Sequence, residues 1–495
     1  MSREARDDAC RNAALPEEDN LTAKAVSDVG FRSDRGPILI SLMVTTGLVA
    51  IDATVLATAV PTIVKDLGGF SLFPWLFSIY LLAQAVTTPI YAKLSDVFGR
   101  KPIILFGIAL FLLGSILCGL AWSMPALIAF RAVQGLGAGA VQPTSITIVG
   151  DIYTVAERAR TQGYLASVWG VASVVGPTLG GLFSQFGIWR VVFFINIPFC
   201  IVAGAMLIRF FREQVERRPH RVDYLGAVLL TASLSLIILA VLEGGQAWAW
   251  DSPISIGAFA VGGIMLAAFF FVEKRAPEPI LPLWVFTRRL LLTTTLVGFG
   301  IGAILIGLTS YVPTFLEGSL GVAPLVAGLA LAALTIGWPI SASFSGRFYL
   351  RIGFRNTALI GIGVVLMGAI LLAAFARTPS IAVVAISCFV VGIGMGLTAV
   401  PSLIAAQSSV GWDERGVVTG ANLFARSVGS AVGVAIFGAI ANSIFGPGDA
   451  ASLSSEAIIA GCAAVFLAVA VVVVATVGAT FAVPRTPVVR EPAAS

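Results

Sequence analysis

Long apolar runs separated by short polar segments recur along the whole chain. Each run covers roughly 20 residues or more, the length that an α-helix needs to cross the hydrocarbon core of a bilayer. We expect a membrane-spanning helix in each of fourteen runs: 37–60, 73–92, 103–122, 125–149, 162–186, 190–210, 224–243, 254–272, 290–312, 323–345, 356–376, 380–405, 418–441 and 456–481. The sequence therefore predicts an all-α polytopic membrane protein with fourteen transmembrane helices.

The composition agrees with this pattern. Hydrophobic residues fill 58% of the 495 positions, and only 12% of the residues are charged, about half the share in a soluble domain. This balance excludes a soluble enzyme, a disordered scaffold and a disulfide-stapled secreted module. The five cysteines stand singly, so they predict neither a disulfide framework nor a zinc site. We expect no cofactor and no bound metal.

The distribution of Lys and Arg predicts the orientation of the helices. An even number of spans places both termini on one side of the membrane. With that side taken as the cytoplasm, the cytoplasmic segments hold 26 of the 31 basic residues and the external loops hold three. The other two, Arg131 and Arg426, fall within or at the ends of spans. The positive-inside rule demands such a bias, so the net charge of +5 is a topology signal and indicates no nucleic-acid partner.

Two matches at nearly one offset indicate an internal duplication. The segment 92–102 shares its glycine placement and basic character with the segment 346–355, which lies 254 residues later. Seven residues between Gly137 and Gly181, five of them glycines, recur 257 residues later. Parallel six-helix halves are an architecture of secondary transporters. The predicted organisation is a disordered cytoplasmic tail (1–36), a six-helix bundle (37–211), two inserted helices with their loops (212–289), a second six-helix bundle (290–481) and a cytoplasmic tail (482–495).

Four short segments carry residue patterns that are specific when taken together. They are the first span around Asp52 (51–61), the loop 92–102 with Asp96, Gly99, Arg100 and Lys101, the fourth span from Arg131 to Gly139, and the fifth-span element Gly176-Pro177-x-x-Gly180-Gly181. On these motifs the chain resembles the major facilitator superfamily, in its fourteen-helix drug:proton antiporter branch, over about residues 37–480. The loop departs from the family pattern at Ala92, where glycine is usual, and at Val97, where a basic residue is usual.

Asp52 and Arg131 are ionisable residues inside apolar spans. A carboxylate within the membrane marks an ion or proton pathway by default, and a guanidinium stays charged and stabilises it when it is deprotonated. The resemblance implies that both residues serve proton coupling. The alternatives are a permanent salt bridge that holds helices together, or an Arg131 that is a static counter-ion of Asp52 or Gln84. Residues 131, 135, 138 and 142 form a narrow stripe of small and polar residues that should face a cavity or another helix, not lipid.

The other motif residues suit gating. Charges in the loop 92–102 are candidates for a cytoplasmic latch between the halves; alternatively, Arg100 and Lys101 are only topology anchors. The second copy has Leu350 at the position of Asp96, so the latch would be asymmetric. Pro177 should bend the fifth helix, and Gly176 and Gly180 should let a neighbouring backbone approach. The resemblance implies an antiporter role for Gly176, Pro177, Gly180 and Gly181, against ordinary packing.

Glu317 and Glu243 are weighed as further proton-carrying acids, with an interfacial position as the alternative for each. The function predicted is proton-coupled export of lipophilic drugs, antibiotics or related small molecules through the plasma membrane by alternating access, by a monomer whose partners are its substrates, protons and the lipid bilayer. The alternative is export of one endogenous metabolite. An ATP-driven pump needs the motif G-x-x-x-x-G-K-[ST], yet no Lys here precedes Ser or Thr. The fifth-span element disfavours an importer or sensor, and an enzyme is not expected.

Overall fold

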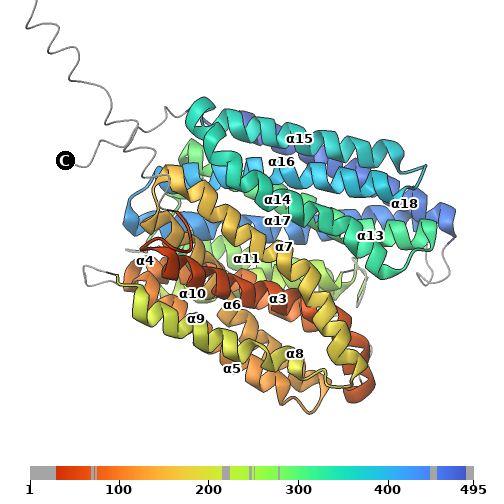
Figure 1. The fold of residues 1–495 in the computed structure, drawn as a ribbon, viewed down its shortest axis with the longest axis horizontal. Helices are drawn as coiled ribbons and strands as arrows, with labels where there is room; N and C mark the ends of the chain where they lie inside the picture. The colour runs from red at the N-terminus through yellow and green to blue at the C-terminus, as the bar shows by residue number, and fades with distance from the viewer. Residues whose placement is uncertain are drawn as a thin grey trace, which may run out of the picture.

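The computed structural model describes residues 29–68, 72, 75–213, 223–244, 248–249, 251–276, 279–445 and 454–485. Helices occupy most of these ranges (Figure 1). They are α3 (Gly36–Leu67), α4 (Trp75–Phe98), α5 (Arg100–Gly119), α6 (Met124–Ile152), α7 (Val155–Gln185), α8 (Val191–Phe194), α9 (Asn196–Phe210), α10 (Tyr224–Glu243), α11 (Pro253–Glu273), α12 (Trp284–Thr287), α13 (Arg289–Leu320), α14 (Pro324–Ile352), α15 (Phe354–Phe375), α16 (Ile381–Ser408), α17 (Arg415–Phe445) and α18 (Ser455–Phe481). A short 3₁₀ turn, η2 (Trp412–Glu414), precedes α17.

Thirteen described helices are long and apolar enough to cross a membrane. The predicted span 224–243 coincides with α10, in which residues 225–241 form a shorter apolar stretch. The all-helical membrane architecture is therefore confirmed, whereas the count of fourteen spans stays a prediction. The segment 1–28 lies outside the described residues.

Several helices are longer than the predicted spans, and two of them continue past a proline. The first and ninth spans were expected to stop before Pro61 and Pro313, but α3 continues to Leu67 and α13 to Leu320. Proline is tolerated inside a membrane helix because neighbouring helices and side-chain hydroxyls satisfy the freed backbone groups. The sixth span is divided into α8 and α9, which meet at Ile195.

Helices α3 to α9 pack into one group, with α5 and α4 against α6 and with α3 against α7. Close approach of α5 and α6 depends on Gly137, because a Cβ there would collide with the backbone of Phe111 and Gly107. Small residues at such crossings are typical of membrane helices, where van der Waals contact replaces the hydrophobic drive between helices.

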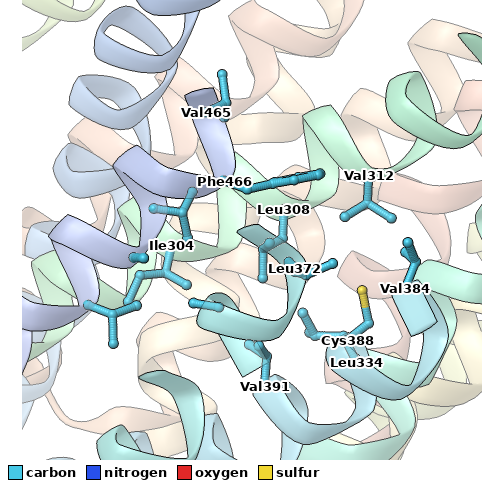
Figure 2. Packing of buried hydrophobic residues seen from close by; sticks show 14 of the residues in the cluster. Ile304, Leu308, Val312, Leu334, Leu372, Val384, Cys388, Val391, Val465 and Phe466 are labelled. Carbon is cyan, nitrogen blue, oxygen red and sulfur yellow. The ribbon is translucent and has the colours of Figure 1, made fainter. Parts of the chain in front are cut away.

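Helices α13 to α18 form a second group with its own apolar core. Leu308 of α13, Leu334 of α14, Leu372 of α15, Val391 of α16 and Phe466 of α18 lie in one cluster of buried side chains (Figure 2). Each of these side chains is at most 3% exposed. Between the two groups in sequence, α10 packs on α11 and also contacts α4 and α17, one helix from each group (Figure 1).

The α4–α5, α6–α7, α14–α15 and α16–α17 connections lie at one end of the bundle, on the left in Figure 1. We call this the basic end, because the segments assigned to the cytoplasm hold most of the Lys and Arg. The two groups touch through α7 against α14 and through α4 against α17. Hydrogen-bonded contacts between them run from the basic end to Ser173 and Thr335, whose hydroxyl oxygens are 3.1 Å apart.

Candidate functional site

An ion pair joins the two predicted coupling residues in the interior of the first group. The Nη1 atom of Arg131 on α6 lies 2.6 Å from Oδ2 of Asp52 on α3, and both residues are at most 2% exposed. Arg131 also donates to the carbonyl of Leu76 at 3.1 Å, and its guanidinium lies over the ring of Tyr80, 4.2 Å from the centroid. Both residues were predicted from the sequence as site residues, and the structure brings them into direct contact.

Amide side chains satisfy the remaining carboxylate oxygen of Asp52. Gln134 donates to Oδ1 at 2.8 Å, and Asn196 of α9 donates to the same atom at 3.3 Å. Ser115 of α5 accepts from both amides, at 2.8 Å and 3.2 Å. Neither Ser115 nor Asn196 was predicted as a site residue, although an Asn within an apolar span is a usable signal.

Within the described part of the chain, Asp52 thus accepts one hydrogen bond at Oδ2 and two at Oδ1. A buried charge pair whose members are also hydrogen-bonded is strongly held, and removing one member costs about 3–5 kcal/mol. The alternative of a counter-ion at Gln84 is not realised, since Gln84 donates to Gln142 at 2.8 Å instead. Of the predicted stripe, Gly135 packs on the backbone of Tyr80 in α4, so the stripe faces a helix at that point.

A second cluster of charges ties the groups together at the basic end. Asp96, at the end of α4, accepts from the backbone N–H groups of Gly416 and Val417 at 2.9 Å and 2.7 Å. Those donors belong to the first turn of α17, where free N–H groups and the helix dipole favour an anion. The carboxylate also pairs with Arg100 at 2.7 Å, and both side chains are at most 1% exposed.

Arg100 extends this cluster to a residue that sequence analysis missed, Asp151. The Nε atom of Arg100 lies 3.0 Å from Oδ2 of Asp151. Arg415 of α17 approaches the other carboxylate oxygen of Asp151 at 3.2 Å. Arg100 further donates to the carbonyl of Trp412 at 2.6 Å and lies over that indole, 4.1 Å from its centroid. Arg100 is thus more than a topology anchor, because it is buried and joins both groups.

Lys101 acts within the first group only. Its Nζ donates to the carbonyls of Ile208 and Phe211 at the end of α9, at 2.9 Å and 2.6 Å. Gly99 separates α4 from α5 with φ of 97°, a conformation that residues with a Cβ rarely adopt. Gly353 separates α14 from α15 with φ of 83° and is the counterpart of Gly99 at the offset of 254 residues.

The second contact between the groups has different chemistry. The Tyr349 hydroxyl donates to the carbonyl of Val155, and Nη1 of Arg158 donates to the Ser408 hydroxyl at 3.1 Å. Leu350, which occupies the Asp96 position of the second copy, is exposed. The contact of α4 with α17 therefore uses a buried carboxylate, and the described contacts of α7 with α14 do not. Ala92 of the first copy packs on Gly420, so a glycine on α17 makes room for the methyl group that replaces the family's usual glycine.

The fifth-span element lies mainly against α3. A Cβ at Gly176 would collide with Thr54, and a Cβ at Gly180 would collide with Thr58 and the carbonyl of Val55. Close backbone approach at both glycines was expected, and the structure has it. Gly181 differs, since nothing lies within 4 Å of its would-be Cβ. The side chain of Pro177 lies outside the described residues.

The two further acids are not brought to the buried pair. Glu317 is exposed near the end of α13, and its carboxylate has no hydrogen bond or ion pair within the described ranges. The side chain of Glu243 lies outside the described residues. Beyond the spans, Asp66 accepts from the Trp189 indole at 3.0 Å and from Arg190 at 2.8 Å. These two hydrogen bonds, the indole's first, lower the pKa of Asp66.

Arg426, the second arginine inside a predicted span, has no role predicted from the sequence. It is the twelfth residue of the 31-residue helix α17, and it is partly exposed. Its guanidinium lies 5.2 Å from the centroid of Trp338, the central residue of α14. Within the described ranges, no carboxylate pairs with it.

The sequence model of the Major Facilitator Superfamily matches residues 42–434. Multidrug resistance protein 3 of Bacillus subtilis is 36% identical over 410 residues, which cover 82% of this chain and 80% of that protein. Multidrug transporter protein MdtP of the same organism is 34% identical over 418 residues, 84% of this chain and 77% of that protein.

A solved structure of the human organic anion transporter MFSD10 (TETRAN) is similar in fold. It superposes with a TM-score of 0.64 at 15% sequence identity and covers 90% of this chain and 99% of that one. At this identity the likeness shows the fold alone.

Proposed function

This chain belongs to the Major Facilitator Superfamily, and we propose that it is a proton-coupled antiporter that exports small lipophilic molecules through the plasma membrane. Both termini and the basic end lie in the cytoplasm, as the bias of Lys and Arg favours. The relatives named multidrug resistance protein and multidrug transporter support drug-like substrates. The protein moves its substrates without changing them chemically, and it works as a monomer.

The observation that carries proton coupling is the ion pair between Asp52 and Arg131 inside apolar helices. Protonation of the carboxylate removes its attraction for the guanidinium, so proton binding and rearrangement of α3 against α6 are linked. The described conformation, with the pair formed, is then the deprotonated one. Because Asp52 is 2% exposed, proton access requires movement of its surroundings.

The contacts between the two groups support alternating access. They join the groups at the basic end, through Asp96 on α17 and through Tyr349 on α7. With the basic end in the cytoplasm, this is a conformation closed toward the cytoplasm. A proton bound from outside at Asp52 then favours the opposite conformation, in which these contacts break, substrate enters from the cytoplasm and the proton leaves. The cluster at Asp96 and Arg100 is the latch of this cycle, and the fifth-span glycines hold α7 on α3 as it moves.

Transport into proteoliposomes tests the function. The purified full chain is reconstituted, and a panel of cationic, neutral and anionic lipophilic dyes is followed under an imposed pH gradient. Movement of at least one dye that an uncoupler abolishes is expected. Dye movement that requires ATP and ignores the gradient would contradict the antiporter proposal, and protein-free liposomes are the control for leak.

A further inference from the structure

Arg131 and Arg426 both lie well inside membrane-spanning helices, α6 and α17, and their surroundings differ. Arg131 is 1% exposed and contacts Asp52, Gln134 and the Leu76 carbonyl. The side chain of Arg426 is partly exposed and has no hydrogen bond or ion pair within the described part of the chain. A guanidinium stays charged at any physiological pH. Arg426 is thus a permanent cation at membrane depth whose counter-charge the described residues do not supply.

The one described contact of the Arg426 guanidinium is an aromatic ring. Trp338 comes from α14, whereas Arg426 comes from α17, and these helices contact the first group on opposite flanks, at α7 and at α4. The ring therefore meets the guanidinium on the side of the second group that faces the first. Thr335 and Pro339, which lie near Trp338 on α14, face Gly170 of α7. The pair of Arg426 and Trp338 therefore lies next to the interface of α7 with α14, which must open and close during transport.

We propose that Arg426 and Trp338 bind the anionic group and the aromatic body of an exported substrate, so that aromatic, lipophilic anions are a substrate class of this protein. The inference rests on the proposed export function and names the chemistry that its site selects. Charged residues in membrane spans mark substrate and ion pathways, and they pair with an opposite charge. Guanidinium groups match carboxylates through two parallel hydrogen bonds, and indole faces stack on flat rings.

The backbone fixes the pair in position. The carbonyl of Arg426 lies against Gly302 of α13, where a Cβ would collide with it, and Ser430 donates to the Gly302 carbonyl at 3.0 Å. Asn422, one turn earlier, donates to the carbonyl of Thr294 at 3.0 Å. This segment of α17 is therefore held on α13 on both sides of Arg426, and the guanidinium needs no rearrangement of its helix to receive a ligand.

A series of isosteric probes tests the charge preference without any gradient. The full chain in nanodiscs is titrated calorimetrically with 1-naphthoate, 1-naphthamide and 1-naphthylmethylammonium, and empty nanodiscs correct for partition into lipid. We expect naphthoate to bind at least tenfold more tightly than the amide, and the ammonium to bind most weakly. Equal affinity for the three probes, or no measurable binding of naphthoate, would overturn the proposal.

Variants then locate the preference. Arg426→Gln should make naphthoate and naphthamide equal, Arg426→Lys should keep part of the preference, and Trp338→Leu should weaken both probes together. Arg377→Gln removes an exposed basic residue and should change nothing. Preference for naphthoate that persists in Arg426→Gln would overturn the assignment; if that variant does not fold, Arg426→Lys and the wild-type series still decide. Charge-selective binding without gradient-driven transport would instead refute the proposed function and leave the site standing.

Discussion

Replacing Asp96 by Asn should open the basic end. The substitution removes the charge that pairs with Arg100 and weakens the acceptor of the Gly416 and Val417 N–H groups. Removing one partner of a buried ion pair costs about 3–5 kcal/mol. Asp151 still neutralises Arg100, so the lower value applies. About 3 kcal/mol corresponds to roughly a hundredfold shift in the equilibrium between closed and open forms.

Maleimide labelling of a cysteine introduced in place of Ala159 measures this shift. Ala159 is 1% exposed and lies against Gly346 on the other flank of the contact, so labelling at this position reports opening of the whole basic end. Cys10→Ser provides the background, since the four other cysteines are buried. Asp96→Asn should raise the labelling rate roughly a hundredfold.

The matched control is Lys101→Gln, which removes a charge from the same loop but contacts only α9. It should leave the labelling rate unchanged. The reasoning would be refuted if Asp96→Asn left the labelling rate of the introduced cysteine as low as in the unaltered background. It would also be refuted if Lys101→Gln raised that rate as much as Asp96→Asn does.

Three further predictions concern orientation, packing and pH. In whole cells an impermeant maleimide should label Thr378→Cys but not Asn356→Cys, at opposite ends of α15; labelling of both, or of Asn356→Cys alone, contradicts the assigned orientation. Gly180→Ala should lower the melting temperature, because overpacking costs about 1–3 kcal/mol, whereas Gly181→Ala, with open space around it, should not; equal melting of the two variants contradicts the packing argument. Because the folded-state pKa of Asp66 is lowered, its stabilisation is present above the unfolded pKa of about 3.9 and is lost as pH falls below it. The difference in melting temperature between wild type and Asp66→Asn should therefore be largest at neutral pH and shrink toward pH 3. A difference that does not depend on pH would contradict this role of the Asp66 carboxylate.

Much of the fold could be predicted from the sequence, because a bilayer leaves few solutions. Apolar runs of sufficient length had to be helices, and the positions of all fourteen runs coincide with described helices. The differences lie at helix ends, for example at Pro61 and Pro313, past which α3 and α13 continue although proline disfavours a helix interior. In a membrane bundle the cost of leaving backbone groups unsatisfied in lipid is higher than the cost of a proline, so the helix continues.

The candidate site divides in a similar way. Asp52 and Arg131 could be found because a charge in an apolar span is conspicuous. Asp151 could not, because it stands at the end of α6, where a solvated carboxylate is ordinary. Only the packing of α5 and α17 against α6 brings Arg100 and Arg415 to it. Asn196 stood out as an Asn in an apolar span, but its hydrogen bonds to Asp52 and Ser115 depend on contacts of α9 with α3 and α5, which have no signature along the sequence.

Proton release on substrate binding tests the central claim most directly. The detergent-solubilised full chain is mixed with a transported dye in weakly buffered solution, and the pH change is recorded for wild type and Asp52→Asn. In the proposed cycle the proton leaves Asp52 as substrate enters, so wild type should release protons when the dye binds. The variant, which imitates the protonated carboxylate, should bind the dye and release none. Proton release from Asp52→Asn equal to that from wild type would contradict the account, because another acidic residue would then carry the transported proton.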